Sequence, residues 1–74
     1  MENSNTPEII NIFAKNMKKI RLERKLSQEQ LSFESGLHKN YISDAERGYR
    51  NISLKAVEKI AKGLHVNVDE LFKK

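Results

Sequence analysis

The chain contains no cysteine, so neither a disulfide nor a thiolate metal site can stabilise its fold. No apolar run approaches the roughly 20 residues that a membrane-spanning helix needs. The N-terminus is polar where a signal peptide would be apolar, and we therefore expect a cytoplasmic protein. The 74 residues allow one domain at most, which helix packing must hold together, with the help of a partner chain where one binds.

The spacing of apolar residues predicts five helices and no strand, so the expected fold class is all-α. Residues 1–8 are polar and contain the only proline, and we expect them to form a flexible arm before a domain over residues 9–74. A first helix over about residues 9–24 is predicted by one apolar stripe, which comprises Ile9, Phe13, Met17 and Ile20.

Residues 26–48 (LSQEQLSFESGLHKNYISDAERG) have the pattern of two short helices joined by a tight turn. Ser27 and Gln30 can cap each other's backbone amides where the first helix starts, and Gly36 supplies the positive φ at which it can end. The second helix closes at Gly48. The apolar residues expected on these two helices are Leu31, Phe33, Ile42 and Ala45. About three residues separate the helices, which is the helix-turn-helix spacing that places a helix in the DNA major groove.

Two more helices are expected at the C-terminal end. Ser53 is the predicted N-cap of the fourth helix, whose inward face should comprise Leu54, Val57, Ile60, Ala61 and Leu64. Asn67 and Glu70 predict a second capping arrangement, at the start of a short fifth helix that carries Leu71 and Phe72.

Positive charge exceeds negative charge, with a formal net charge of +4. The excess is concentrated over residues 15–25, which carry six basic side chains against Glu23 alone. A basic chain favours polyanionic partners. A solvated helix face is the alternative interpretation of this run, but beside a helix-turn-helix we expect part of it to face phosphates.

From about Phe13 to Phe72 the chain resembles the lambda-repressor-like, Cro-type helix-turn-helix family. The motifs that carry this resemblance are Met17-x-x-Ile20-Arg21, Leu26-Ser27-Gln28-x-x-Leu31, Tyr41-Ile42-Ser43-x-x-Glu46-Arg47-Gly48 and Ile60-Ala61-x-x-Leu64-x-Val66. The stretch over residues 37–64 is similar to the controller proteins of bacterial restriction–modification systems, which are small homodimeric regulators. Two positions depart from the pattern: Lys25 and His65 stand where the family often has glycine, so both are expected in left-handed backbone.

The resemblance implies a compact five-helix fold and a DNA-reading surface. Lys39, Asn40 and Tyr41 lie in the first turn of the recognition helix, where their donors can meet base edges. Arg50 corresponds to a base-reading residue of controller proteins. Phosphate contacts are expected from Gln28, Ser43, Arg47 and Asn51. The resemblance also predicts a partly buried ion pair between Arg21 and Glu46.

We expect a sequence-specific, dimeric regulator of transcription that binds a palindromic operator. The proposed dimer interface is formed by apolar residues at the C-terminal end: Leu64, Val66, Leu71 and Phe72. A phage-type repressor or an antitoxin of the same fold remains open, as does a helical protein–protein adaptor. No residue pattern argues for an enzyme, and no cofactor, metal, membrane or small-molecule ligand is expected.

Overall fold

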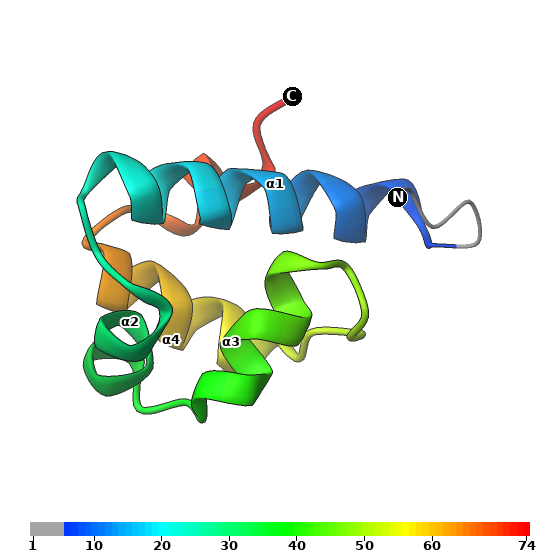
Figure 1. Cartoon of the computed structure of the whole chain (residues 1–74). Helices are drawn as coiled ribbons and strands as arrows, with labels where there is room; N and C mark the ends of the chain where they lie inside the picture. The colour runs from blue at the N-terminus through cyan, green and yellow to red at the C-terminus, as the bar shows by residue number, and fades with distance from the viewer. Residues whose placement is uncertain (1–5) are drawn as a thin grey trace.

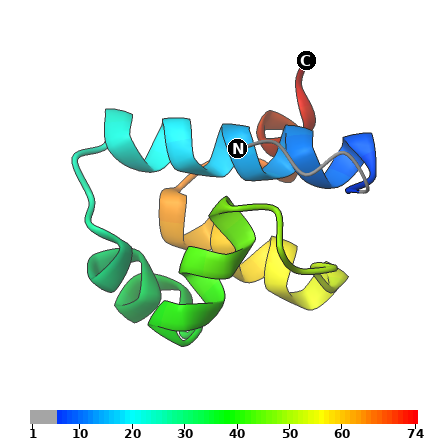
Figure 2. The ribbon, with the colours of Figure 1, turned by 45° about the vertical axis from the view of Figure 1, so that its right-hand side comes forward.

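The computed structural model describes residues 6–74, and these form four α-helices and a short 3₁₀ helix with no strand among them. The elements are α1 (Glu8–Glu23), α2 (Gln28–Ser35), α3 (Lys39–Glu46), α4 (Leu54–Leu64) and η1 (Val68–Phe72). α1 lies along one side of the molecule, and α2, α3 and α4 lie together beneath it (Figures 1 and 2). The all-α, five-element fold predicted from the sequence is confirmed.

A single core fills the space between the helices. Its fully buried side chains come from every element and include Met17, Leu31, Ile42, Ile60, Leu64 and Leu71. α2 packs against α4 so closely that a Cβ on Gly63 would lie 2.9 Å from Leu31 Cδ1 and 3.2 Å from the Ser35 backbone nitrogen. Glycine at this position therefore sets how near the two helices can approach.

Two of the three predicted caps are present, and a further residue also caps a helix. Ser27 and Gln30 form the reciprocal capping box of α2, and Ser53 Oγ accepts a hydrogen bond from the Ala56 amide at the start of α4. His38 caps α3 through its imidazole, which accepts from the Asn40 amide. The predicted cap at Asn67 is wrong, because its side chain makes no capping hydrogen bond and the element that follows is a 3₁₀ helix.

The two expected left-handed positions are confirmed, with φ of 59° at Lys25 and 60° at His65. Both residues follow a helix, where the chain must reverse its course. A side chain with a Cβ is strained in this conformation, which costs roughly 1–2 kcal/mol.

Three apolar residues of the predicted helical patterns are exposed, and one of them, Leu54, was expected on an inward face. Leu54 is 87% exposed and Phe33 is 86% exposed, and Ile9 is also more than half exposed. Helical spacing identifies a stripe, but the width of the stripe that is covered depends on the neighbouring elements. Leu54 is the first residue of α4 and lies beyond the edge of the core.

The C-terminal end of the chain is fixed to α1 by specific contacts. Asn16 Nδ2 donates to the backbone oxygens of Leu71 and Lys73, at 3.0 and 2.7 Å. Residues 1–5 of the predicted N-terminal arm lie outside the described residues, whereas Glu8 already belongs to α1. No helix in the described part of the chain is long and apolar enough to cross a membrane.

Candidate nucleic-acid interface

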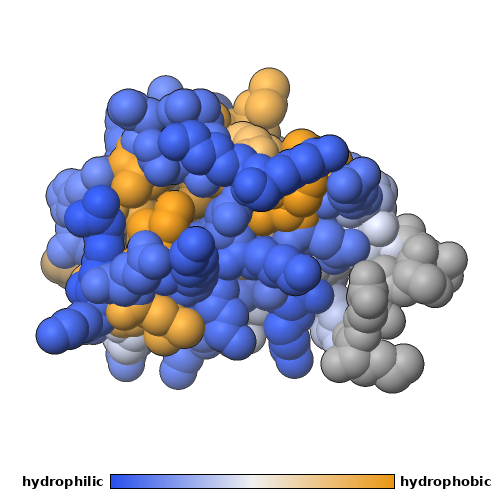
Figure 3. All heavy atoms as spheres, turned by 90° about the horizontal axis from the view of Figure 1, so that it is seen from above, coloured by the Kyte–Doolittle hydropathy of each residue, from blue (hydrophilic) through white to orange (hydrophobic). Residues whose placement is uncertain are grey.

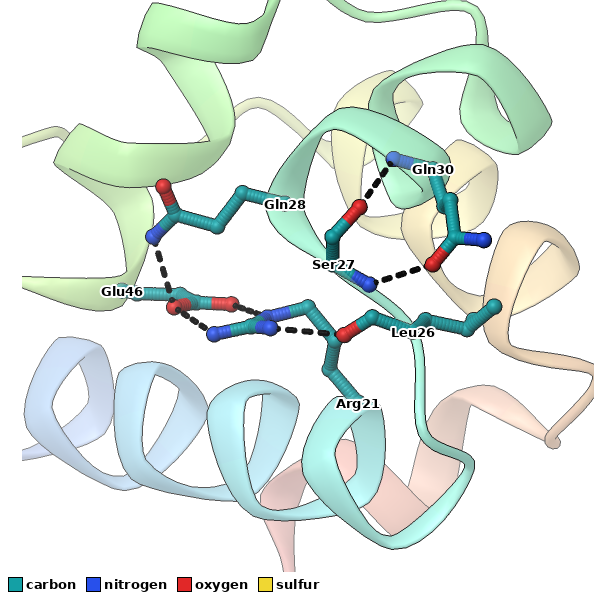
Figure 4. A network of polar contacts seen from close by, with 6 residues as sticks. All are labelled: Arg21, Leu26, Ser27, Gln28, Gln30 and Glu46. Atoms are coloured by element: carbon teal, nitrogen blue, oxygen red, sulfur yellow. Dashed lines mark hydrogen bonds and ion pairs between the residues drawn. The ribbon is translucent and has the colours of Figure 1, made fainter.

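A polar network fixes α3 relative to α1 and α2 (Figure 4). Arg21 donates from Nε to Glu46 Oε2 at 2.6 Å and from Nη2 to Glu46 Oε1 at 3.0 Å. Its third nitrogen, Nη1, donates to the Leu26 backbone oxygen at 2.7 Å. The two side chains are 8% and 2% exposed. The predicted ion pair is therefore present, and it joins the end of α3 to α1 and to the turn before α2.

Gln28 also belongs to this network, a structural role that was not predicted from the sequence. Its Nε2 donates to Glu46 Oε1 at 3.1 Å, so one carboxylate oxygen accepts from both α1 and α2. Because Gln28 is the first residue of α2, its backbone amide also lies at the open, positive end of that helix. The side chain predicted to contact phosphate thus also has a structural partner.

The turn between α2 and α3 is short and hydrogen-bonded. Gly36 ends α2 with a φ of 76°, and Ser32 Oγ donates to the Leu37 backbone oxygen. His38 then caps α3, as its Nδ1 accepts from the Asn40 amide at 3.0 Å. These bonds give α3 a defined direction of departure from α2, as a helix-turn-helix requires.

α3 has one buried face and one exposed face. Ile42 and Ala45 are buried in the core, whereas Lys39 and Asn40 in the first turn are exposed. Tyr41 is half-buried. The first turn therefore exposes the ammonium group of Lys39 beside the carboxamide of Asn40, while the opposite face of the helix is packed in the core.

A second cluster lies along α3 and the turn that follows it, and we call it the arginine cluster: Tyr41, Asp44, Arg47, Tyr49 and Arg50. Asp44 contacts both arginines, with Oδ1 at 3.1 Å from Arg47 Nη2 and Oδ2 at 3.6 Å from Arg50 Nη2. Each guanidinium also lies over an aromatic ring. The distance from guanidinium carbon to ring centroid is 4.6 Å for Arg50 over Tyr41 and 4.9 Å for Arg47 over Tyr49.

The remaining predicted contact residues lie near this cluster. Ser43 is half-buried on α3, and Asn51 is exposed in the loop before α4. The structure thus brings Lys39, Asn40, Tyr41 and Arg50 to one exposed region. Asp44, which contacts two arginines in the structure, was not among the residues predicted for this surface.

The basic run begins on α1, which carries three lysines besides Arg21. Lys15, Lys18 and Lys19 are exposed, on a helix whose buried side faces α3 and α4. Seen from above, over α1, the surface is largely hydrophilic with separate hydrophobic patches (Figure 3). That part of the basic run faces phosphates stays a prediction.

Two of the residues proposed for a dimer interface are unsuitable. Leu64 and Leu71 have no exposed surface, because both are fully buried in the monomer core. Val66 and Phe72 are partly buried against that core, and the Phe72 ring lies 5.5 Å from the ring of Phe13. Val68, which is 42% exposed, is the most exposed apolar residue of this segment.

The fold and its exposed third helix define a helix-turn-helix protein, and residues 17–71 match the family model described as helix-turn-helix. The chain is 49% identical over 61 residues to the control protein C.BamHI from Bacillus amyloliquefaciens, which covers 81% of this chain and 75% of that protein. It belongs to the helix-turn-helix family of restriction–modification controller proteins.

Solved structures agree with this assignment. The controller protein C.AhdI from Aeromonas hydrophila superimposes with a TM-score of 0.82 at 40% identity, covering 85% of this chain and 96% of that one. The controller protein C.Esp1396I, as a tetramer in complex with its natural 35 base-pair operator, gives a TM-score of 0.80 at 36% identity. That match covers 90% of this chain and 99% of the other.

Proposed function

We propose that this chain is a sequence-specific, homodimeric DNA-binding regulator of transcription, the controller of a restriction–modification system. The observation that carries the proposal is the immobilised α3 with its donor-rich first turn. The Arg21–Glu46 pair and the His38 cap hold the helix, while Lys39 and Asn40 remain exposed. A helix held in this way can enter the major groove with its side chains already oriented.

Each base-reading residue has a donor pattern that matches a base edge. Lys39 can donate to guanine O6 and N7, and the carboxamide of Asn40 can pair with adenine through two hydrogen bonds. Arg50 can donate through two parallel N–H groups to guanine, and the ring of Tyr41 beneath it offers a contact for a thymine methyl group. These contacts would supply sequence preference.

A second group of residues would fix the protein on the backbone without reading sequence. The first amides of α2, at Gln28 and Glu29, lie at the positive end of a helix dipole, which favours a phosphate. Ser43, Arg47 and Asn51 would add further donors along the same strand of DNA.

A dimer is proposed because one recognition helix makes few base contacts. Two copies related by a two-fold axis would place their α3 helices in successive major grooves, roughly 34 Å apart, on a palindrome in the cytoplasm. Val66, Val68 and Phe72 are the candidates for the contact between copies. The operator-bound tetramer of the related C.Esp1396I supports assembly of this kind.

Selection of bound sites from random duplexes tests the proposal. The wild-type chain should enrich a palindrome, and Lys39→Ala and Arg50→Ala should each lose the preference at one position per half-site, at a cost of about 1–3 kcal/mol. Lys15→Ala removes the same charge from the exposed face of α1 and is the matched control, which should keep the same consensus. A wild type that enriches no sequence would overturn the proposal.

A phage-type repressor or an antitoxin of the same fold is the alternative. The neighbouring genes distinguish them, since a controller should be encoded beside a restriction enzyme and a methyltransferase.

A further inference from the structure

The arginine cluster places a carboxylate on the surface that is proposed to meet a polyanion. Asp44 lies between Arg47 and Arg50, at 3.1 and 3.6 Å, and its side chain is 30% exposed. A carboxylate near phosphates is repelled by DNA of every sequence. Its presence there calls for a compensating role.

We propose that Asp44 is a positioning residue that sets specificity, because it holds the guanidinium of Arg50 against the ring of Tyr41 in the orientation that reads guanine. The inference rests on the proposed function and adds to it the residue through which Arg50 gains its selectivity. Two constraints act on the same group: the ring of Tyr41 lies 4.6 Å from the guanidinium carbon, and Asp44 Oδ2 lies 3.6 Å from Nη2.

The orientation of the Arg50 guanidinium matters because guanine recognition needs two of its parallel N–H groups at once. An arginine side chain has several rotatable bonds, and an unrestrained one can satisfy a nearby phosphate as readily as a base. Asp44 draws Nη2 to one side, and the Tyr41 ring restricts rotation of the plane. The remaining N–H donors of the Arg50 guanidinium can then meet guanine O6 and N7 without further ordering of the side chain.

The same carboxylate reduces binding to unrelated DNA. It partly neutralises Arg47 and Arg50, and it repels phosphates wherever α3 approaches a duplex without a matching base. At the operator this penalty is offset by the guanine contact, and elsewhere it is not. Asp44 therefore raises the ratio of specific to non-specific affinity, because it favours the guanine contact at the operator and weakens binding to unrelated DNA.

The experiment compares binding at one fixed salt concentration for wild type, Asp44→Asn, Glu34→Gln, Arg50→Ala and the double variant Asp44→Asn/Arg50→Ala. Glu34→Gln removes the same charge from an exposed site on α2, away from the proposed dimer contact, and is the matched control. The duplexes are the selected operator, the operator changed at the base pair whose preference Arg50→Ala weakens most but does not abolish, and a random sequence. Thermal unfolding of each variant verifies the fold.

Asp44→Asn should bind the random duplex several-fold more tightly and should lose about tenfold of the discrimination at the Arg50 base pair. Glu34→Gln should leave that discrimination unchanged. In the Arg50→Ala background, Asp44→Asn should cause no further loss of discrimination, because the residue acts through Arg50. A merely local surface ion pair would shift all three duplexes alike.

Discrimination by Asp44→Asn equal to that of wild type, or an equal loss in both backgrounds, would overturn the inference while leaving the proposed function intact. A wild type with no preference among the three duplexes would overturn the proposed function itself. Asp44→Ala serves as a second variant, and it should reproduce the loss of discrimination because it also lacks the carboxylate.

Discussion

Arg21 and Glu46 are 25 positions apart in the chain, and they meet in a two-point ion pair that is almost completely shielded from water. Every nitrogen of the guanidinium has a partner, since Nη1 donates to Leu26. Both carboxylate oxygens also accept hydrogen bonds. The pair ties the recognition helix to α1, so the position of the reading surface depends on it.

Arg21→Ala should lower the free energy of unfolding by about 3–5 kcal/mol, because it leaves the buried Glu46 carboxylate without its counter-charge. Arg47→Ala is the control, since it removes an exposed pair with Asp44 and should cost less than about 1 kcal/mol. Urea denaturation of the two variants measures the difference. An Arg21→Ala protein as stable as wild type would show that the pair contributes nothing.

Gln28→Ala should act on both stability and binding, because the side chain donates to Glu46 and lies at the expected phosphate site. The lost hydrogen bond should lower the free energy of unfolding by about 1 kcal/mol. Operator and random duplexes should be weakened to a similar extent, since a phosphate contact carries no base information. Fluorescence anisotropy with both duplexes measures the ratio, and a loss confined to the operator would instead assign Gln28 to base reading.

The features that could be predicted from the sequence are those set by residues close together in the chain. The capping box at Ser27 and Gln30 and the cap at Ser53 act over three or four residues, so the sequence displays them directly. The left-handed backbone at Lys25 was predicted because the resemblance placed a turn there. Asn67 carried the same kind of signal but makes no cap, because the chain forms a 3₁₀ turn there instead.

Features that depend on several elements at once do not show in local patterns, and the Arg21–Glu46 pair was predicted only through the family resemblance. Leu54 and Phe33 are exposed because they lie beyond the edge of the core, and the position of that edge cannot be read from the sequence of one helix. The role of Asp44 depends on the conformations of two arginines, one of which lies in the following loop. Gln28 was predicted to bind phosphate, and its bond to Glu46 emerges only when α2 is docked against α3.

His65→Gly should stabilise the protein by up to about 1 kcal/mol, because glycine adopts the φ of 60° without the clash of a Cβ. Lys62→Gly is the matched control, in the last turn of α4, where it should destabilise by about 1 kcal/mol. Both substitutions give the unfolded chain the same extra freedom, so the difference between them reports the native backbone. Denaturant midpoints of the two variants provide the measurement, and shifts of the same sign would contradict the strain at His65.

The dimer prediction concerns the surface next to η1. Phe72 packs on Phe13, so replacing it would disturb the monomer, whereas Val68 is 42% exposed and can be changed safely. Val68→Glu places a charge in the proposed two-fold contact and should raise the dissociation constant of the dimer at least tenfold. Leu22→Glu is the control, because Leu22 is similarly exposed but lies on α1. Sedimentation equilibrium measures both variants against wild type.

A wild type that stays monomeric at tens of micromolar, where the binding free energy is weaker than about −6 kcal/mol, would show that the dimer forms only on DNA or not at all. Equal dissociation of the two variants would place the interface elsewhere.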